Sequence, residues 1–466
     1  MLMELRIDRQ AMVPVVQQIV DGLASWIAQS EVPPETRLPS VRQIARLNLL
    51  SQSSVVEACE RLVVQGVLAS RPGCGFQVAT SLAVAPQTLD LPRFEGLHSL
   101  CSASLSGELL LGCGGLPESW RETDDLSYAI REVTRTDMAG LFNYSTPLGL
   151  LPLRQQILQR LKPLNIVAPE SSVLTTAGAS QALDLIVRTL LKPGDYVVVE
   201  SPGFAHLFDL LRLHGVRMLA VPRTPTGPDT RVLERLCREH SPRAMFINSF
   251  HHNPTGSCLT AVVAQKILQL SRAHGVLVIE DDVYADMHHA PGTRLAALDD
   301  GARVIYVGSF SKTLSSSLRV GFVLAGEGRI AQLAEVKMVS SMGGSRFCES
   351  VLANLLSTGA YRKLIQRQRQ RLSMDRAAAL QLLEDAEWEV FGKPVGGLFI
   401  WARSTRCDYA QLRTLARRFG VLLSSATAFS PGGEASSWQR INVAYACDPR
   451  ARRFFQASAG DRPKTF

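Results

Sequence analysis

A short apolar run at residues 303–307 leads into a loop that concentrates reactive and phosphate-binding side chains. The run is rich in β-branched residues and apolar on both faces, which is typical of a buried strand in a parallel sheet. Lys312 therefore follows the carboxyl end of a predicted strand, with Ser309 and Ser311 before it and Arg319 after it. A lysine amine can bond covalently to an aldehyde, while hydroxyls and an arginine can hold a phosphate. This combination predicts a site for pyridoxal phosphate (PLP).

Two other interpretations fit the same loop. Ser309 and Lys312 also match the serine–lysine pair of penicillin-binding enzymes, but no Lys-Thr-Gly triplet follows them. A surface lysine after a strand is the simpler alternative. The residues at the ends of the other predicted strands are therefore needed to choose among these interpretations of the loop.

From about residue 108, short apolar strands alternate with helices, which predicts an α/β domain with a mostly parallel sheet. Ligands bind beyond the carboxyl ends of the strands in such sheets. Four further strands are followed by groups suited to different parts of one ligand: small residues with exposed amides, an aromatic ring, an amide, and a carboxylate with a phenol. In chain order these residues are Ala179, Ser180 and Gln181, then Phe204, then Asn253, then Asp281 and Tyr284. This ordered set, together with the lysine, favours the PLP site.

Length and composition limit the class of protein. A chain of 466 residues predicts two or three domains, and 46% hydrophobic with 20% charged residues is typical of a globular protein. The nine cysteines include no Cys-x-x-Cys pair, and His288 and His289 lack partners at metal spacing, so we expect neither a disulfide framework nor a metal site. No apolar run approaches the length of a membrane span, and the charged first residues are unlike a secretory signal. We therefore expect a cytoplasmic protein without a membrane partner.

The first eighty residues have a different pattern. An amphipathic first helix is followed by a second helix that Ser40 opens through a capping box with Gln43. Asn48 is suited to the left-handed turn after this helix, and Ser51 or Ser53 caps a third helix. Two short strands joined by a tight hairpin complete the order helix, helix, turn, helix, wing.

This segment resembles the winged helix-turn-helix of GntR-type transcription regulators over about residues 10–80. The resemblance rests on the strings Arg37-Leu38-Pro39-Ser40-x-Arg42, Ser53-Ser54-Val55, Leu62-x-x-x-Gly66 and Arg71-Pro72-Gly73-x-Gly75. It implies that the third helix enters the major groove of double-stranded DNA. The residues expected to contact DNA are Arg37, Ser40, Arg42, Gln52, Ser53, Ser54 and Arg71. Gln52 replaces an arginine that is frequent in such proteins, and glutamine can pair with adenine. A winged helix used only for protein contact is the alternative.

About residues 110–450 resemble the fold-type I PLP enzymes of the class I/II aminotransferase family, which have a large mostly parallel sheet and a smaller C-terminal subdomain. The resemblance implies that Lys312 bonds PLP covalently and that Asp281 pairs with the pyridine nitrogen, which keeps the ring an electron sink. It also implies that Arg440 binds a substrate carboxylate. Ser316 and Ser317 depart from the family, which often has proline and glycine there.

The remaining contacts to PLP are implied by the same resemblance. Asn253 and Tyr284 would hydrogen-bond the ring hydroxyl, and Phe204 would stack on the ring. The residues expected to hold the phosphate are Ala179, Ser180, Gln181, Ser309, Ser311 and Arg319. Tyr144 resembles the tyrosine that reaches the phosphate of the neighbouring subunit, which implies a head-to-tail homodimer.

A DNA-binding domain ahead of an aminotransferase-like domain is the arrangement of the MocR subfamily of GntR regulators, which the chain resembles end to end. The expected parts are residues 1–80, a linker at 81–107 and residues 108–466. The resemblance implies a transcription regulator that senses PLP, an amino compound or their adduct, with little or no turnover. The alternatives are an active aminotransferase with an appended DNA-binding domain, and a regulator whose PLP domain serves only for dimerisation.

Overall fold

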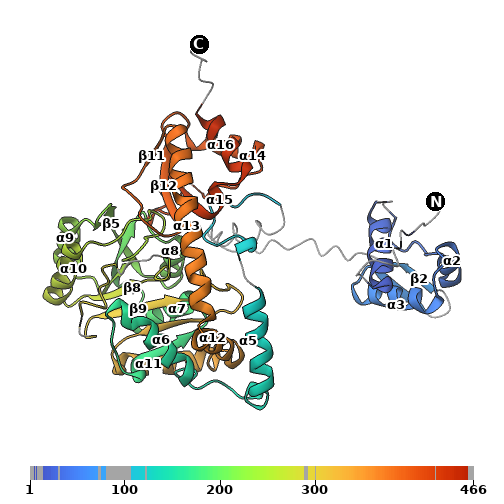
Figure 1. Ribbon diagram of the computed structural model, residues 1–466, viewed down its shortest axis with the longest axis horizontal. Coiled ribbons are helices and arrows are strands. Elements are labelled where there is room, and N and C mark those ends of the chain that lie inside the picture. The colour runs from blue at the N-terminus through green and yellow to red at the C-terminus, as the bar shows by residue number, and fades with distance from the viewer. Residues whose placement is uncertain are drawn as a thin grey trace, which may run out of the picture. The chain divides into compact units, whose positions relative to one another are not determined.

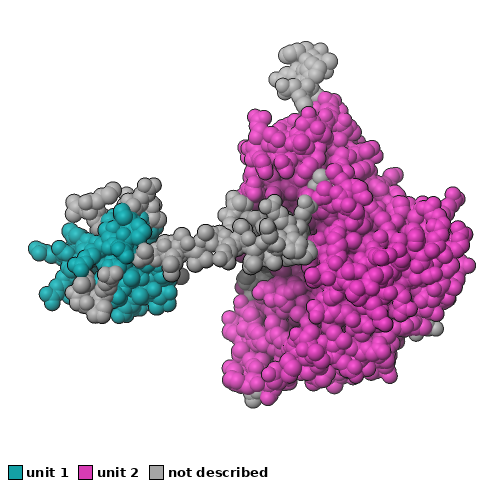
Figure 2. Space-filling view, turned by 180° about the vertical axis from the view of Figure 1, so that it is seen from behind, with its two compact units in different colours: residues 1–93 teal, residues 94–466 magenta. Residues whose placement is uncertain are grey.

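The computed structural model describes residues 5, 7, 14–29, 32–71, 75–79, 107–120, 123–287, 292–299, 301–425 and 427–459. The chain divides into two compact units, residues 1–93 and 94–466 (Figure 2). The division lies inside the segment predicted as a linker, of which only Gly107 is described. The wing tip at residues 72–74 and the histidines His288 and His289 also lie outside the described residues.

The described residues of the first unit form three helices and a two-stranded antiparallel hairpin (Figure 1). Its elements are α1 (Val15–Gln29), α2 (Val41–Leu47), α3 (Gln52–Val64), β1 (Leu68–Arg71) and β2 (Gly75–Val78). The amide of Gln43 donates to the Ser40 hydroxyl over 3.3 Å, and the amide of Ser40 donates to the Gln43 side chain over 2.9 Å. The predicted capping box therefore forms. Ser51 caps α3, since its hydroxyl accepts a 3.0 Å hydrogen bond from the amide of Ser54.

The turn after α2 differs from the sequence prediction at Asn48. Its φ is −109°, and the left-handed conformation falls on Leu49, whose φ is 54°. The side chain of Asn48 donates to the carbonyl of Ile44 over 3.0 Å and accepts from the amide of Leu5 over 2.7 Å. Because these bonds hold Asn48 against the end of α2, the next residue makes the left-handed turn instead.

The second unit is built on an eight-stranded sheet with the order β3-β10-β9-β8-β7-β4-β5-β6. The neighbouring strands β9, β8, β7, β4 and β5 pair in parallel. Strand β10 is antiparallel to both its neighbours, and β6 is an antiparallel edge strand. The prediction of a mostly parallel sheet is thus confirmed. The strands are β3 (Val173–Thr176), β4 (Tyr196–Ser201), β5 (Arg217–Thr224), β6 (Gly227–Pro228), β7 (Ala244–Ile247), β8 (Leu277–Asp281), β9 (Val304–Ser309) and β10 (Gly321–Leu324).

Helices cover both faces of this sheet because successive strand residues point to opposite sides. In β4, Val197 and Val199 pack with α7, α8 and α11, whereas Val198 packs with α9 and α10. Tyr306 of β9 and Phe322 of β10 join a third cluster with α5, α6 and α12. These helices are α5 (Thr123–Thr136), α6 (Leu151–Leu161), α7 (Ala179–Leu190), α8 (Ala205–Leu213), α9 (Thr230–His240), α10 (Ala261–His274), α11 (Glu327–Ser341) and α12 (Arg346–Ser357).

A smaller C-terminal subdomain follows the long helix α13 (Ala360–Asp385) (Figure 1). Tyr361 and Ile365, near the start of α13, pack in the large subdomain, and Leu372 and Leu383 pack in the core of the small one. The helix therefore joins the two subdomains. The small subdomain contains the antiparallel sheet β11 (Trp388–Val390), β12 (Phe399–Ser404) and β13 (Gln439–Asn442), with α14 (Tyr409–Arg418), α15 (Val443–Ala446) and α16 (Pro449–Ser458).

Short 3-10 helices also occur among the described residues: η1 (Glu118–Trp120), η2 (Ala139–Phe142), η3 (Lys162–Leu164) and η4 (Glu170–Ser172). Among the helices of the described part, none combines the length and the apolar character needed to cross a lipid bilayer.

Candidate functional site

The lysine predicted to react lies in a turn directly after β9, at the carboxyl edge of the sheet. The Nζ atom of Lys312 donates a 2.9 Å hydrogen bond to the carbonyl of Gly114. Burial, followed by the positive charge of Arg440, lowers the pKa of Lys312 to about 8. A lysine with a lowered pKa is partly neutral near physiological pH, which makes its amine a nucleophile.

Asp281, the last residue of β8, lies close enough to Lys312 for their charges to interact. Burial raises the pKa of Asp281 to about 7, while the Val283 amide, which donates to its Oδ1 over 3.2 Å, and the Lys312 charge oppose that rise. A carboxylate in this setting is costly without a cation beside it. The position therefore favours a positively charged partner such as a protonated ring nitrogen.

An anion cradle lies between the Lys312 loop and the start of α7. The guanidinium of Arg319 donates to the carbonyl of Ala177 over 3.0 Å and lies 3.5 Å from the Ser311 hydroxyl. Ser309 accepts a 3.2 Å hydrogen bond from the amide of Ser311. Gly178 caps α7 with φ 82°, and a Cβ there would lie 2.7 Å from Arg319. Glycine therefore keeps open the space between the arginine and the helix start, where amides attract anions.

Ala179 and Ser180 lie in the first turn of α7, but the side chain of Gln181 already has two hydrogen-bond partners. Its Oε1 accepts a 2.7 Å hydrogen bond from the amide of Ala177, and its Nε2 donates to Ser341 over 3.2 Å. Gln181 therefore holds the loop before α7 in place.

Two predicted ring-binding residues follow the carboxyl ends of different strands, Phe204 after β4 and Tyr284 after β8. Phe204 caps α8 after β4 and is half-buried, with its ring centroid 5.8 Å from that of His206. Tyr284 is buried and meets the ring of Phe399 edge-on at 5.5 Å. Burial raises the pKa of Tyr284, so its phenol keeps its proton and can donate a hydrogen bond.

Arg440, on β13, brings the small subdomain into the site. Its Nη1 donates to the side-chain oxygen of Asn253 over 2.8 Å, and its Nε and Nη2 donate to the carbonyl of Gly112 over 3.1 and 2.7 Å. The guanidinium also lies 4.7 Å and 4.8 Å from the ring centroids of Phe399 and Phe429. This charged group is held in one orientation by aromatic and carbonyl partners, with no carboxylate paired to it among the described residues.

Sequence reasoning missed the segment at residues 112–115. Gly112 and Gly114 supply the carbonyls that bind Arg440 and Lys312, and a Cβ at Gly114 would lie 3.4 Å from the Lys312 amine and 3.8 Å from the Arg440 guanidinium. Asn442 donates to the carbonyls of Cys113 and Gly115 over 3.0 and 2.7 Å. The run Gly-Cys-Gly-Gly was the available signal, because close backbone approach calls for glycine.

A second missed residue, Asn248, supports two of the predicted ones. Its Oδ1 accepts a 2.7 Å hydrogen bond from the amide of Asn253, and its Nδ2 donates to the carbonyl of Asp281 over 2.7 Å. Glu200 in turn accepts from the amide of Asn248 over 2.8 Å and from Arg223 over 2.5 Å. This buried network fixes the spacing between the strand ends that carry the amide and the carboxylate.

His206 was also missed. Burial lowers the pKa of its imidazole; the charge of Asp209 opposes this shift, and the charges of Lys312 and Arg319 add to it. Its position two residues after Phe204 was the only sequence signal.

The side chain of Tyr144 is 76% exposed. Its neighbour Ser145 is anchored by a 2.6 Å hydrogen bond to the buried Glu349. An exposed tyrosine on an anchored segment is compatible with the predicted contact to a second subunit, which stays a prediction.

The departures at Ser316 and Ser317 lie on the exposed outside of the lysine loop. The hydroxyl of Ser315 accepts hydrogen bonds from the amides of Ser317 and Leu318 over 3.2 and 3.4 Å. Arg319 then takes φ 50°. The loop therefore reaches the arginine without proline or glycine.

The predicted DNA-contacting side chains that can be described lie at the starts of α2 and α3. Arg37, Ser40, Arg42, Gln52 and Ser53 are exposed, and Ser54 is half-buried with its hydroxyl 2.7 Å from that of Ser51. Arg71 ends β1, but its side chain lies outside the described part. The opposite side of α3 packs into the core through Val55, Ala58 and Leu62, so one polar helix face stays open to solvent.

Comparison with known proteins agrees with both units. Residues 107–456 match the family "Aminotransferase class I and II". The chain belongs to this family. Residues 15–78 match "Bacterial regulatory proteins, gntR family". The chain thus joins a GntR-type DNA-binding domain to an aminotransferase-like domain, and the predicted MocR arrangement is confirmed.

The similar proteins include both regulators and enzymes. The uncharacterized HTH-type transcriptional regulator YisV of Bacillus subtilis is 28% identical over 94% of each chain. The 2-aminoadipate transaminase of Thermus thermophilus is 31% identical over 70% of this chain and 81% of its own. The crystal structure of LysN, an alpha-aminoadipate aminotransferase from Thermus thermophilus, matches with a TM-score of 0.70 and 26% identity over 77% of this chain and 94% of that one.

The aminotransferase family implies PLP as cofactor, and the donor set fits it. The site offers a nucleophilic amine for the aldehyde of PLP and a buried acid for its ring nitrogen. The arginine-lined anion cradle is suited to its phosphate. The described residues contain no group of His, Cys, Asp or Glu side chains placed to hold a metal ion.

Proposed function

We propose that this protein is a PLP-dependent transcription regulator whose aminotransferase-like domain senses PLP, an amino compound or their adduct. The observation that carries the proposal is the convergence of Lys312, Asp281 and Arg440 in one site of a chain that also has a GntR-type domain with an exposed polar helix face. An enzyme has no need of that domain.

Bound PLP would supply an aldehyde that exchanges between amines and a ring that withdraws electrons. Lys312 would hold the cofactor covalently, and Asp281 would bind the ring nitrogen. Arg319, Ser309 and Ser311 would bind the phosphate together with the first amides of α7. Tyr284 and Asn253 would hydrogen-bond the ring hydroxyl, and Phe204 would stack on the ring.

Arg440 gives the effector a chemical class. The guanidinium of Arg440, on β13, lies near the amine of Lys312. An effector with both an amine and a carboxylate would therefore engage both groups at once. Lys312 follows a strand of the large subdomain, whereas Arg440 belongs to the small one. A ligand that bridges them favours one arrangement of the two subdomains, which is the differential binding that any switch requires.

We also propose a head-to-tail homodimer in which Tyr144 reaches the phosphate of the neighbouring subunit. Its exposure and the anchoring of Ser145 support this proposal. A dimer would carry two DNA-binding domains and match an operator with two half-sites.

An active aminotransferase is the second candidate, favoured by the 31% identity to a transaminase and by the convergence of the reacting groups. Both candidates are tested with DNA recovered by a genomic pull-down of the purified protein. Operator affinity is measured with and without PLP and a panel of amino acids, alongside transamination of the same panel. A regulator changes its operator affinity and turns over far more slowly than the ~1 per second at which ordinary enzymes begin. Ordinary turnover with unchanged affinity would favour the enzyme.

A further inference from the structure

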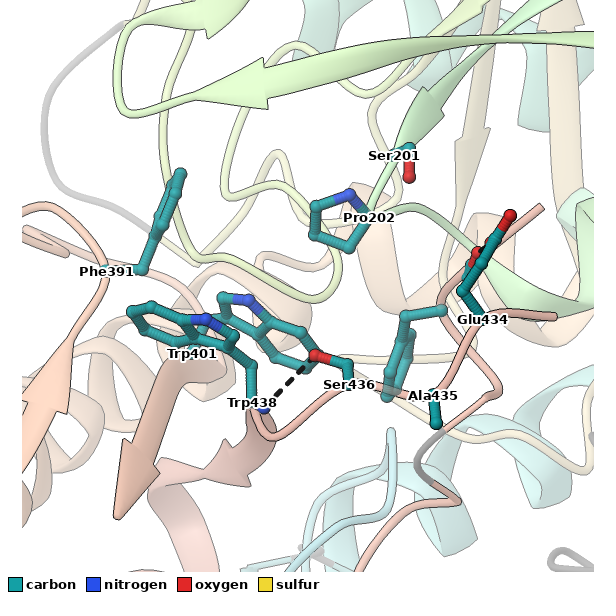
Figure 3. Close-up of a pocket in the computed structure, with 10 residues that line it drawn as sticks. Ser201, Pro202, Phe391, Trp401, Glu434, Ala435, Ser436 and Trp438 are labelled. Atoms are coloured by element: carbon teal, nitrogen blue, oxygen red, sulfur yellow. Dashed lines mark hydrogen bonds between the residues drawn. The ribbon is translucent and has the colours of Figure 1, made fainter. Parts of the chain in front are cut away.

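A cavity of about 330 Å³ opens between the large and small subdomains of the second unit. It lies beside the loop after β4 and the face of the small sheet that carries Trp401 (Figure 3). Its lining is mainly aromatic, with hydroxyls and one acid: Ser201, Pro202, Phe391, Trp401, Phe429, Ser430, Glu434, Ala435, Ser436 and Trp438. A volume of this size suits a small organic ligand.

The rings of this cavity take two orientations, one parallel pair and two rings nearly perpendicular to it. The indoles of Trp401 and Trp438 are nearly parallel, with 10° between their planes and 6.3 Å between centroids. The ring of Phe429 stands at 83° to Trp401, and that of Phe391 at 86° to Trp438. Pro202 lies across the cavity from the indoles (Figure 3). The lining therefore presents aromatic rings in two nearly perpendicular orientations around the space.

The residues that line the cavity include one acid and no base. Glu434 is the one ionisable residue among the ten that line the cavity, and it accepts a hydrogen bond from Ser430. The same rings already attract cations: Arg403 lies 4.9 Å from the Trp438 centroid, and Arg440 lies 4.8 Å from that of Phe429. The charge of Arg403 is balanced by Glu389, which accepts its hydrogen bond over 2.6 Å.

We propose that this cavity binds a small organic cation, of the methylated or quaternary ammonium class, with the rings around its methyl groups and Glu434 at its charge. Aromatic cages bind quaternary ammonium groups through the negative faces of their rings. A bare carboxylate site would prefer a small, strongly hydrated cation, whereas apolar rings favour a cation that carries methyl groups and little hydration.

Such a ligand would touch both subdomains. The carbonyl of Phe429 accepts a 2.9 Å hydrogen bond from the amide of Gly203, next to Phe204, and the ring of Phe429 contacts Arg440. Cation binding is thereby linked to the site at Lys312. The proposal does not depend on the regulatory function, because the cavity is complete without PLP or DNA.

The test is isothermal titration calorimetry of the full-length protein with choline and with its uncharged analogue, in which carbon replaces nitrogen. Choline binds at least about tenfold more tightly than the analogue, a difference expected from cation–π attraction together with one carboxylate. Glu434→Gln weakens choline binding about fivefold or more and leaves the analogue unchanged. Trp438→Leu weakens both ligands. Glu335→Gln, at an exposed helix position outside the cavity, changes neither.

Equal affinity for choline and the analogue would overturn the proposal, as would unchanged choline binding in the Glu434→Gln protein. The Glu434 residue is exposed, so this variant is expected to fold even if the Trp438 variant does not. Failure to bind choline at millimolar concentration would also overturn it. None of these outcomes bears on the operator measurements above.

Discussion

The Nη1 atom of Arg440 donates a 2.8 Å hydrogen bond to the side-chain oxygen of Asn253, which joins strand β13 of the small subdomain to the loop after β7. Asn253 is also a predicted ligand of the cofactor ring. One hydrogen bond therefore connects the group expected to bind a carboxylate with a group expected to bind PLP, and changes at either residue should be felt at the other.

Replacing Arg440 by lysine removes the planar fork but keeps the charge. We expect the affinity for amino acids to fall about tenfold to a hundredfold, because charge-assisted hydrogen bonds are lost, while amines without a carboxylate bind as before. Absorbance titration of the PLP-loaded protein measures both classes of ligand. Arg406→Lys, whose residue pairs with Glu387 on the surface, is the matched control. Equal losses for both ligand classes would show that Arg440 does not select the carboxylate.

The lowered pKa of Lys312 predicts how PLP uptake depends on pH. Only the neutral amine attacks the aldehyde, and the pKa of about 8 lies inside the working range. The rate at which the yellow absorption band forms in the PLP-free protein should rise about tenfold from pH 7 to pH 9 and then level off. Stopped-flow absorbance follows it. Lys312→Ala should form no such band, and a rate that does not change with pH would contradict the predicted role of the amine.

Replacing the Asp281 carboxylate should have opposite effects on PLP affinity and on the stability of the PLP-free protein. Since its folded pKa is raised to about 7, the ionised carboxylate destabilises the PLP-free protein above pH 7, and this cost fades as the pH falls toward 4. Asp281→Asn should therefore raise the Tm of the PLP-free protein at pH 8, by about 2 °C or more, with a smaller gain in mild acid. The same variant should bind PLP more weakly, because the ring nitrogen loses its acid. A scan that finds equal gains at both pH values would be inconsistent with the buried charge.

Asn248 should contribute to stability and to PLP binding, although it is not expected to contact the ligand. Asn248→Leu leaves the amide of Asn253 and the carbonyl of Asp281 without their 2.7 Å partner, which should cost about 1–3 kcal/mol of unfolding free energy and weaken PLP binding. Asn248→Asp keeps the acceptor but loses the donor, so it should fall between the wild type and the leucine variant. Denaturant unfolding and PLP titration provide the two readouts. Wild-type PLP affinity in the leucine variant would mean that the strand ends are positioned by other contacts.

For the DNA-binding domain, we predict how the salt dependence of operator affinity changes on mutation. Arg42 is exposed at the start of α2, and a phosphate contact there releases counterions. Arg42→Ala should weaken operator binding and reduce the slope of log affinity against log salt by about 1. Arg61→Ala is a suitable control, because Arg61 pairs with Glu57 along α3. Fluorescence anisotropy at several salt concentrations distinguishes the two, and an unchanged slope for Arg42→Ala would argue against a phosphate contact.

Much of the fold and of the site followed from local patterns. The capping box at Ser40 and the buried runs that became β4, β7, β8 and β9 are set by neighbouring residues, and each run delivered its functional group at its carboxyl end. Because parallel strands end at one edge of the sheet, chain order was enough to bring Lys312 and Asp281 together.

Other parts depend on partners far away in sequence. The carbonyl of Gly112 binds Arg440 across 328 residues, and no local pattern encodes that pairing. The role of Asn248 depends on its contacts with Asn253 and Asp281, which no local pattern encodes. The left-handed conformation falls on Leu49 and not on Asn48, because the Asn48 side chain accepts a hydrogen bond from the amide of Leu5. Tertiary contacts decided each of these cases.

The most direct test of the regulatory account is operator affinity, measured by fluorescence anisotropy, for the wild-type protein and for Lys312→Ala across a titration of PLP and amino acids. The account predicts a shift of about fivefold to 150-fold in the wild type, the usual range of coupling between two sites, and no shift in the variant. An equal shift in both proteins, or a wild-type affinity that ignores every ligand, would contradict it.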